Sequence, residues 1–491
     1  MKTQILIVGG GPVGLYLQYR FLRLGFDSLL IEQRNGISHH SKSIGIHPVI
    51  LESFAKCPTG SGSIADRWID AGIKIRKGIA FWNQNRIGEV RFDAQRRKFD
   101  AQQRRFDFIL ALPQWETERV LEDAVLELNP ESMLRGVKAI SMEPSMHWKN
   151  TGEVVVQVRT ETGAGQQVEA GQQVEAGLQV EAGLQAEAGQ QVKARLQVEA
   201  GQQVAAGQQA GARQQFKKYQ QEGTRQQSGE HHAGDDQQAD TKSARETQIE
   251  IRAQLVIACD GKHGATREWL GISKTGVRYP DTYIMGDFDD HTSFGTDAAV
   301  YLHRDGLVES FPLPGEKRRW VVKTDSFCEE QPELLLRSLL EERLQQDPGS
   351  QNADRVSAFR VQHEIAAEFG RGRVFLAGDS AHVVSPIGGQ GMNLGWLGAD
   401  CLISEMMALQ GVSEEVLSEP WLATLLSRYE KKHRKIALQV GKRAEWNMRI
   451  GRRESHKPWV EAILKSALRY RKTNRLLADL FTMRGLGSWP V

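Results

Sequence analysis

The chain has few cysteines and no long apolar run, and both shortages limit what it can be. Its 491 residues include four scattered cysteines, with no C-x-x-C pair and no spacing typical of a metal site: Cys57, Cys259, Cys328 and Cys401. This pattern indicates reduced structural thiols rather than a disulfide framework, and no metal. No run of about 18 apolar residues occurs and no secretory leader is seen, so we expect a cytoplasmic protein with no integral membrane segment.

An excess of charge of one sign is also missing. The formal net charge is +2, which gives no reason to propose nucleic acid as a partner. The motifs G-x-S-x-G, H-E-x-x-H and G-K-[ST] do not occur, which argues against hydrolases, zinc peptidases and P-loop proteins. The length predicts two or three domains, and hydrophobic residues, at 40% of the chain, can supply a sizeable core.

The first motif in the sequence is a glycine motif near the N-terminus. Residues 4–8 read as a buried parallel strand, and G-x-G-x-x-G (Gly9, Gly11, Gly14) follows at once. A helical pattern comes next, and a second strand ends in Glu32, 18 positions after the last glycine. Such glycines allow close approach to a pyrophosphate, while the acid holds ribose hydroxyls. Glu32 also disfavours a 2′-phosphate, because two negative charges would face each other. The alternative is a structural turn that binds no phosphate.

A second glycine-rich stretch covers residues 372–395. An apolar strand ends at Asp379, and a loop with Pro386 leads to a helical pattern that opens near Met392. Asp379 can accept hydrogen bonds from sugar or ribityl hydroxyls. The loop glycines let backbone N–H groups approach a ligand, and the helix opening adds unpaired N–H groups and a positive dipole end. Alone, the stretch could be an ordinary strand-to-helix turn. Beside the N-terminal motif, it predicts the other half of one nucleotide site.

A third element completes a family pattern. Residues 255–258 form an apolar strand that is followed by D-G-x(5)-R, from Asp260 to Arg267. With G-x-G-x-x-G, G-D-S-A-H and P-x-G-G-Q-G-M-N, this motif resembles the class A, single-component FAD-dependent flavoprotein monooxygenases, the aromatic hydroxylase group that includes p-hydroxybenzoate hydroxylase. Residues 41–48 and 112–118 are also similar to that family. The resemblance covers nearly the whole chain outside an internal insertion.

The resemblance implies an α/β fold with three parts. We expect a Rossmann-type FAD-binding domain, an inserted mixed β-sheet substrate domain and a C-terminal helical region. The FAD-binding domain is expected to be discontinuous, in residues 1–72, 110–160, 246–275 and 365–410. The substrate domain takes residues 73–109 and 276–364, and the C-terminal helices take residues 411–491.

Residues 161–245 form the low-complexity insertion. Residues 163–213 repeat with a period of six, as in Gly-Gln-Gln-Val-Glu-Ala. Each unit supplies one medium apolar side chain, which favours a disordered expansion over a hexapeptide β-helix. It is flanked by residues 153–160 and 247–252, in which apolar and polar side chains alternate as in a strand. We therefore expect the insertion at the tip of a β-hairpin. A smaller basic duplication at residues 91–107 is interpreted as a loop extension rather than a nucleic-acid arm.

The resemblance also implies an activity. NADH or NADPH would reduce FAD, O2 would form a hydroperoxide at flavin C4a, and an aromatic or similar small substrate would be hydroxylated. The partners would then be that substrate and O2, with a monomer or homodimer. Alternatives are a related FAD-dependent reductase, dehydrogenase or halogenase on the same fold, or a scaffold that has lost activity. The halogenase motif W-x-W-x-I-P is absent, and the intact motif ends count against a scaffold.

The resemblance assigns Pro386 to the oxygen-transfer region and gives no acid or base. The family usually has arginine where Lys42 stands and often serine where Gly264 stands. The expected FAD contacts are Gly9, Gly11, Gly14, Glu32, Gln33, Lys42, Gln114, Asp260, Arg267, Asp379, Gly388, Gly391, Met392 and Asn393.

Overall fold

The structure is a computed structural model. It describes residues 1–39, 43–92, 105–143, 151–160, 247–328, 330–345, 353–410, 416–484 and 486. Lys42, the six-residue repeat and most of the basic duplication lie outside the described residues.

The first sheet has a parallel centre that is covered on both faces. Strand β1 (Lys2–Val8) pairs in parallel with β2 (Ser28–Glu32) on one side and with β13 (Thr247–Ala258) on the other. Strand β20 (Val374–Leu376) pairs in parallel with the end of β13. Where they pair in parallel near their carboxyl ends, at residues 5–8, 29–31, 255–258 and 374–376, these strands are apolar and buried because both faces of the sheet are covered. Their carboxyl ends lie at one edge, where the three motifs begin.

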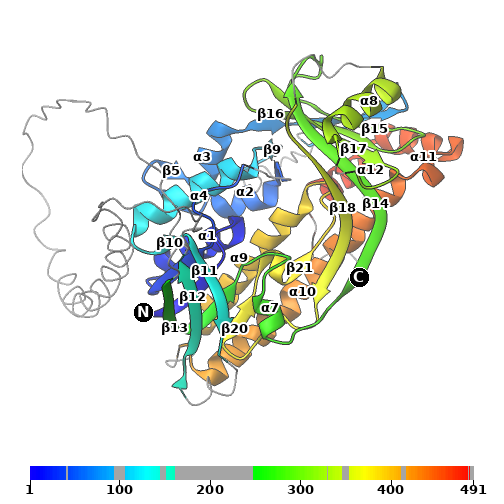
Figure 1. Ribbon diagram of the computed structural model, residues 1–491. Coiled ribbons are helices and arrows are strands. Elements are labelled where there is room, and N and C mark those ends of the chain that lie inside the picture. Colours follow the sequence, from blue (N-terminus) through cyan, green and yellow to red (C-terminus); the bar gives the residue numbers. More distant parts are fainter. Residues whose placement is uncertain are drawn as a thin grey trace, which may run out of the picture.

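Further strands and helices surround this centre (Figure 1). Strand β10 (Met133–Arg135) extends the sheet beside β2. On the other side, β12 (Val154–Thr160) pairs antiparallel with β13, and β11 (Val137–Met142) pairs antiparallel with β12. Short strand β19 (Gly370–Arg371) pairs with β20. The helices that pack around the sheet and its edge are α1 (Pro12–Arg23), α2 (Pro48–Phe54), α3 (Ile64–Ala71), α4 (Gln114–Leu128), α7 (Thr266–Trp269) and α9 (Gln390–Gln410).

The second sheet is mixed and, like the first, has eight strands in the described part of the chain. Its spatial order is β21 (His382–Val383), β18 (Asp354–Ala366), β14 (Lys274–Asp289), β17 (Lys317–Thr324), β16 (Val308–Leu313), β15 (Ala298–Leu302), β7 (Lys77–Trp82) and β8 (Asn85–Arg91). Helix α8 (Pro332–Leu344) covers one face through an apolar cluster. The opposite face carries a second cluster that includes Ile387 from the loop before α9.

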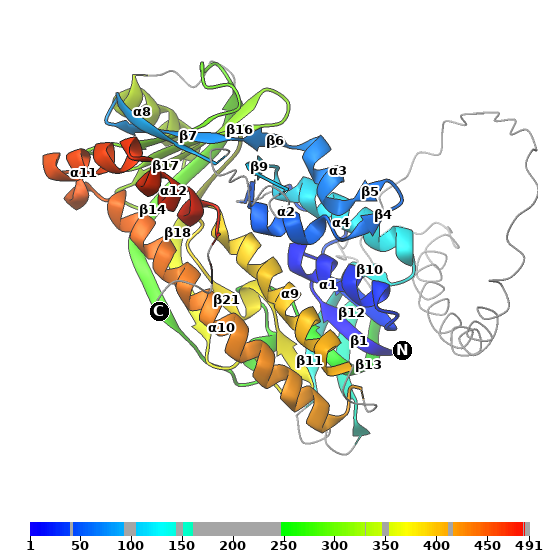
Figure 2. The ribbon, with the colours of Figure 1, turned by 180° about the vertical axis from the view of Figure 1, so that it is seen from behind.

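Smaller elements join the two sheets. A three-stranded sheet holds β3 (Gly45–Ile46), β9 (Ile109–Ala111) and β6 (Ile73–Ile75), and β4 (Pro58–Thr59) pairs with β5 (Gly62–Ser63). The C-terminal part contains α10 (Glu419–Ile450), α11 (Pro458–Arg469) and α12 (Arg471–Phe481). Figure 2 shows the long helix α10 running beside α9 and reaching toward the second sheet.

The predicted fold class is confirmed: an α/β chain with a Rossmann-type sheet, a second mixed sheet and C-terminal helices. The domain boundaries stay a prediction, and β14 crosses the proposed boundary at residue 275. The C-terminal helices expected over residues 411–491 include the basic stretch 459–483. It is broken at Tyr470 into α11 and α12, and α11 buries no residue completely because it lies against the edge strand β8. None of the described helices is long and apolar enough to cross a membrane.

The predicted hairpin is present. Strands β12 and β13 are antiparallel, with Thr160 directly opposite Thr247. We therefore expect that an Asn-Gly turn can replace residues 161–246 without loss of the fold. Closing a shorter loop costs less conformational entropy on folding. The free energy of unfolding should therefore stay equal or rise, by up to about 3 kcal/mol. Thermal unfolding of the shortened and full chains tests this, and aggregation of the shortened chain alone would contradict it.

Candidate functional site

A cavity of about 1120 Å³ lies between the two sheets. It starts at the carboxyl edge of the first sheet, beside Gly11 and Glu32, and continues to the inner face of the second sheet at Val321 and Phe359. Ligand pockets for drug-sized molecules usually occupy about 300–1,000 Å³. This cavity is larger and joins two chemically different ends, one rich in backbone and acidic groups, the other apolar.

The three N-terminal glycines have different roles at the first end. Gly9 has a φ of +111°, and a Cβ there would lie 2.4 Å from the carbonyl oxygen of Cys259. A Cβ on Gly14 would lie 2.0 Å from the Gly9 carbonyl oxygen, so Gly14 lets α1 pack against the turn. A Cβ on Gly11 would meet no atom within 4 Å, and Gly11 lines the cavity. Two of the glycines therefore shape the turn, and the third leaves its backbone open to the cavity.

Glu32 ends β2 as a buried carboxylate. Its Oε2 accepts a hydrogen bond from the Gly10 N–H at 2.6 Å, and its Oε1 accepts from the Arg34 N–H and Nε, both at 2.9 Å. Burial works to raise the pKa of this carboxyl, but the hydrogen bonds from Arg34 and Gly10 outweigh burial and lower it. Glu32 and the adjacent Gln33 line the same end of the cavity. An ionised acceptor is thus fixed next to the glycine turn.

Asp260 connects two of the motifs. Its Oδ2 accepts from the Thr266 N–H at 3.0 Å, and its Oδ1 accepts from the Ser380 hydroxyl at 2.8 Å. A Cβ on Gly264 would lie 2.0 Å from the Asp260 Cγ. Glycine at position 264 therefore makes room for this carboxylate. Arg267 is buried in α7, with Glu268 at 3.6 Å, and it does not line the cavity.

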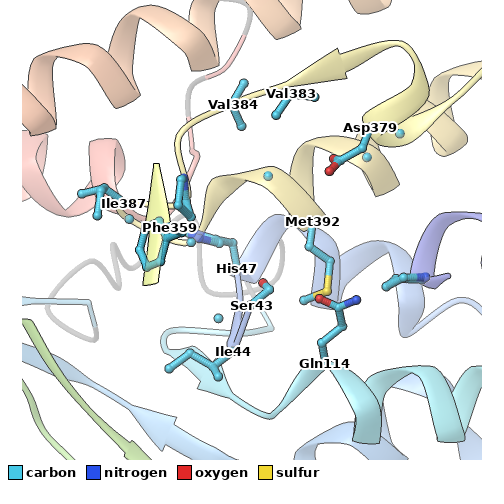
Figure 3. Close-up of a pocket in the computed structure, with 18 of the residues that line it drawn as sticks. Ser43, Ile44, His47, Gln114, Phe359, Asp379, Val383, Val384, Ile387 and Met392 are labelled. Atoms are coloured by element: carbon cyan, nitrogen blue, oxygen red, sulfur yellow. The ribbon is translucent and has the colours of Figure 1, made fainter. Parts of the chain in front are cut away.

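Asp379 points into the middle of the cavity (Figure 3). It is exposed toward the cavity that it lines, and desolvation by the surrounding protein raises its pKa to about 6, although Lys262 works in the opposite direction. Met392 and Gln114 lie together across from it in Figure 3. The Gln114 Nε2 donates to Glu118 Oε1 at 2.7 Å, which fixes the amide at the start of α4. Asp379 is thus an acceptor that faces a ligand-sized space.

The loop before α9 forms the turn between the two ends of the cavity. Pro386, Gly388 and Gly391 line it, and the Gly389 N–H donates to the Pro386 carbonyl at 2.9 Å. Asn393 stands behind the loop. Its Nδ2 donates to the Gly45 and Gly389 carbonyls, both at 2.8 Å, and its Oδ1 accepts from the His47 N–H at 2.8 Å. Asn393 therefore fixes the loop rather than lining the cavity.

Histidines do not supply an obvious acid or base. Burial lowers the pKa of His47 to about 4, so its ring is neutral near pH 7. His382 and His433 form a buried pair, 2.6 Å between their Nε2 atoms, and neither lines the cavity. His263 lines the end of the cavity that lies beside the N-terminal glycine motif.

The second sheet gives the far wall of the cavity, and it is apolar except at a few points. Met285, Val300, Val321 and Phe359 project from four strands of this sheet, and Leu307 directly precedes β16. Glu309 of β16 lies among them, 8% exposed, and burial raises its pKa to about 7. Sequence reasoning missed Glu309. The available signal was a lone acid in the apolar strand Val308–Leu313, but alternation alone does not say which face of a strand meets a cavity.

The structure brings most of the sequence-predicted residues to this cavity. Gly14, Arg267 and Asn393 lie outside the lining, and Lys42 lies outside the described residues. The predicted residues that line the cavity are Gly9, Gly11, Glu32, Gln33, Gln114, Asp260, Asp379, Pro386, Gly388, Gly391 and Met392.

Comparison with known proteins gives relatives of one kind. The chain is 29% identical over 181 residues to para-nitrophenol 4-monooxygenase of Pseudomonas sp. (strain WBC-3), which covers 34% of this chain and 44% of that protein. It is 22% identical over 403 residues to the uncharacterized aromatic compound monooxygenase YhjG of Bacillus subtilis (strain 168), covering 80% and 59%. The chain thus spans about half the length of these curated relatives.

Solved structures share the fold. p-Nitrophenol 4-monooxygenase PnpA from Pseudomonas putida DLL-E4 superposes with a TM-score of 0.68 at 17% identity, over 98% of each chain. The flavin-dependent monooxygenase PieE, solved in complex with FAD and substrate, gives a TM-score of 0.62 at 16% identity, over 98% of this chain and 72% of that one. At these identities the likeness concerns the fold.

A family model also matches most of the chain. The model described as the FAD binding domain matches residues 2–171 and 155–444, and these ranges include all three motifs that meet at the cavity. The chain belongs to the FAD binding domain family.

Proposed function

We propose that this protein is an FAD-dependent monooxygenase that uses NADH or NADPH and O2 to hydroxylate a small aromatic substrate. The observation that carries the proposal is the continuous cavity, which joins the glycine motifs to an apolar wall on the second sheet. The names of the relatives, which include para-nitrophenol 4-monooxygenase, support the same reaction class. The cavity also lies between the residue ranges that we assign to the FAD-binding and substrate domains.

The groups at the glycine end fit FAD. The open backbone at Gly11 and the start of α1 offer N–H groups and a positive dipole end to a pyrophosphate. Glu32 retains acceptor capacity for the adenosine ribose, and Gln33 lies beside it. Asp379 would accept from the ribityl hydroxyls, and Gln114 would contact the ribityl chain or the ring edge. Lys42 is proposed as a further contact.

The start of α9 would meet the flavin ring. Gly388, Gly391 and Met392 line the cavity where the helix opens. Backbone N–H groups in the first helical turn lack partners within the helix, so they can stabilise negative charge on the ring edge. Behind these groups, Asn393 would hold the loop and Asp260 would hold the strand end. Gly14 would shape the glycine turn, and Arg267 would shape α7.

Bound FAD would supply the redox chemistry, taking electrons from the nicotinamide co-substrate and activating O2. The chain's own residues exclude water and position the acceptor ring. Pro386 and Ile387 face the wall formed by Val321 and Phe359, and this wall leaves an apolar space for an aromatic ring. Tight enclosure protects a reactive oxygen species from water, which is the condition for oxygen transfer to carbon.

A direct assay tests this function. The purified protein should carry a flavin spectrum, and NADH or NADPH should bleach it without oxygen. In air, a phenol panel should contain at least one compound that increases NAD(P)H oxidation and yields a hydroxylated product by mass spectrometry. Nicotinamide oxidation without a hydroxylated product for any compound would favour a reductase, and a protein that neither retains nor binds FAD would exclude the proposal.

Asp379→Ala should bind FAD about 10- to 100-fold more weakly, because one hydrogen bond to a charged acceptor contributes roughly 1.5–3 kcal/mol. Flavin content after purification and titration of the apoprotein with FAD measure this loss. Asp70→Ala, at an exposed position in α3, is the matched control and should keep wild-type affinity. If Asp379→Ala binds FAD with wild-type affinity, Asp379 does not contact FAD.

Two glycine substitutions should separate folding from cofactor binding. Gly14→Ala forces a Cβ against the Gly9 carbonyl and should lower the unfolding temperature of the apoprotein by several degrees. Gly11→Ala places its Cβ in open cavity, so the apoprotein should unfold at the wild-type temperature while FAD affinity falls. Thermal unfolding and FAD titration of both variants give the comparison. Equal FAD affinity in Gly11→Ala and wild type would argue against a pyrophosphate at this turn.

A further inference from the structure

Glu309 is a carboxyl group on the apolar wall of the cavity. On the inner face of β16 it stands between Leu307, which directly precedes the strand, and Phe311, each two residues away along the chain. Its direct cross-strand neighbours are Val300 on β15 and Val321 on β17. Within the described part of the chain, no hydrogen bond or ion pair reaches its side chain. A buried carboxyl without a partner is costly, so its position requires an explanation.

The nearby cations on this face already have anionic partners. Arg319 is diagonal to Glu309 on β17, and its Nε and Nη2 bind the Asp287 carboxylate at 2.6 and 2.8 Å. Lys323, the other diagonal position, lies 3.7 Å from Asp281. Asp281 also binds the Arg452 guanidinium at 2.7 Å. Arg319 thus has a carboxylate of its own, whereas Lys323 and Arg452 share the Asp281 carboxylate.

Arg360 of β18 also lines the cavity, with its guanidinium over the Phe327 ring. The neighbours of Glu309 from the other described elements add no charge. Tyr283 of β14 is a buried phenol, and burial followed by the proximity of Glu309 raises its pKa. Strand β15 and residues 384–389 contain no charged residue. From α10, Trp446, Asn447 and Ile450 line the cavity. Glu309 is therefore the acceptor that the apolar wall presents to whatever occupies the space beside it.

The neighbours of Glu309 connect it to the proposed oxygen-transfer region. Val321, directly opposite Glu309, packs in one apolar cluster with Phe359 and Ile387. Ile387 follows Pro386, and both line the cavity just before the start of α9. Figure 3 shows Ile387 and Phe359 close together on this side of the cavity. An aromatic ring that lies against this cluster can reach Glu309 with a polar substituent.

We propose that Glu309 binds the hydroxyl group of a neutral phenol and orients the ring for hydroxylation, an inference that rests on the proposed function. The ionised carboxylate accepts the phenolic hydrogen bond and can accept the proton. In that step the phenolic O–H bond breaks, its electron pair stays on the phenol oxygen, and a carboxylate oxygen gains the proton. The resulting phenolate carries a more electron-rich ring. Proton transfer of this kind is efficient when the acceptor's pKa lies near the working pH.

The same arrangement selects against anionic substrates. A benzoate-type carboxylate beside Glu309 would place two negative charges in an apolar space, and Arg319 is already held by Asp287. A methyl ether has no proton to donate and would leave the Glu309 carboxyl unpaired. The inferred substrate class is therefore an uncharged phenol without a carboxylate group.

Three matched ligands test this assignment on the FAD-loaded protein: 4-nitrophenol, 4-nitroanisole and 4-nitrobenzoate. Calorimetry gives the dissociation constants. The wild type should bind the phenol at least about tenfold more tightly than the ether, the value of one hydrogen bond of about 1.4 kcal/mol, and should bind the benzoate most weakly. Glu309→Leu should lose the preference for phenol over ether. If Glu309→Leu keeps it, Glu309 does not bind the hydroxyl.

The colour of nitrophenolate gives a second readout that does not depend on turnover. Binding to the wild type at pH 7 should increase the nitrophenolate absorbance, because Glu309 takes the proton. Glu309→Gln, nearly isosteric, should bind the neutral phenol and decrease that absorbance. Glu405→Gln, a buried change in α9 outside the cavity lining, is the control and should behave like the wild type. Identical absorbance changes in Glu309→Gln and wild type would overturn the proton-transfer role.

The two proposals can fail separately. If the wild type hydroxylates no phenol, the proposed function fails whatever the behaviour of Glu309 variants. If the wild type hydroxylates phenols and Glu309→Leu retains wild-type ligand discrimination, only the assignment of Glu309 fails. Flavin content of each variant shows whether the FAD site is intact, so a folding defect is recognised directly.

The buried position of Glu309 should also affect how the stability of the protein depends on pH. The folded-state pKa of Glu309 is about 7, above its ordinary value of 4.5. The native state therefore favours the protonated form, and stability is lost as the pH rises from about 4.5 through 7. Glu309→Gln should unfold a few degrees above the wild type at pH 8.5 and at the same temperature near pH 4.5. A difference that is independent of pH would contradict this environment for Glu309.

Discussion

The position of β13 between β1 and β20 is the constraint on which the site depends. Parallel pairing with both strands places Gly9, Asp260 and Asp379 after strand ends at a single edge, although the chain separates them by hundreds of residues. The Asp260 carboxylate then joins the second motif to the third through Ser380. The cavity exists because this edge faces the second sheet, whose strand β18 reaches back to pair with β21 near the same loop.

Much of this could be predicted from the sequence because the relevant signals are local. The strand before Gly9, the helix after it and the acid at position 32 are set by spacing within a single βαβ unit. The strands at β13 and β20, and the hairpin around the insertion, are also short-range patterns. Gly11 and Asp379, whose positions follow from the motifs alone, were therefore predicted, and both line the cavity.

The rest depends on contacts that no local pattern encodes. Asn393 was expected at the ligand but bonds to Gly45, His47 and Gly389, because β3 passes behind the loop. Glu309 was not found because its significance comes from which face of β16 meets the cavity. The glycine at position 264, a departure from the family's frequent serine, is explained by the Asp260 carboxylate that fills the space of a Cβ. Each of these is a tertiary effect.

The pairing of Thr160 with Thr247 has a consequence for the history of the chain. These residues face each other across the ladder, so the pairing of β12 with β13 is complete where the intervening segment begins and ends. Gain or loss of a six-residue unit leaves the register of β12 and β13 unchanged. Repeat number can therefore change without moving the cavity edge, because β13 leaves the insertion at Thr247 and reaches that edge at its other end, Ala258.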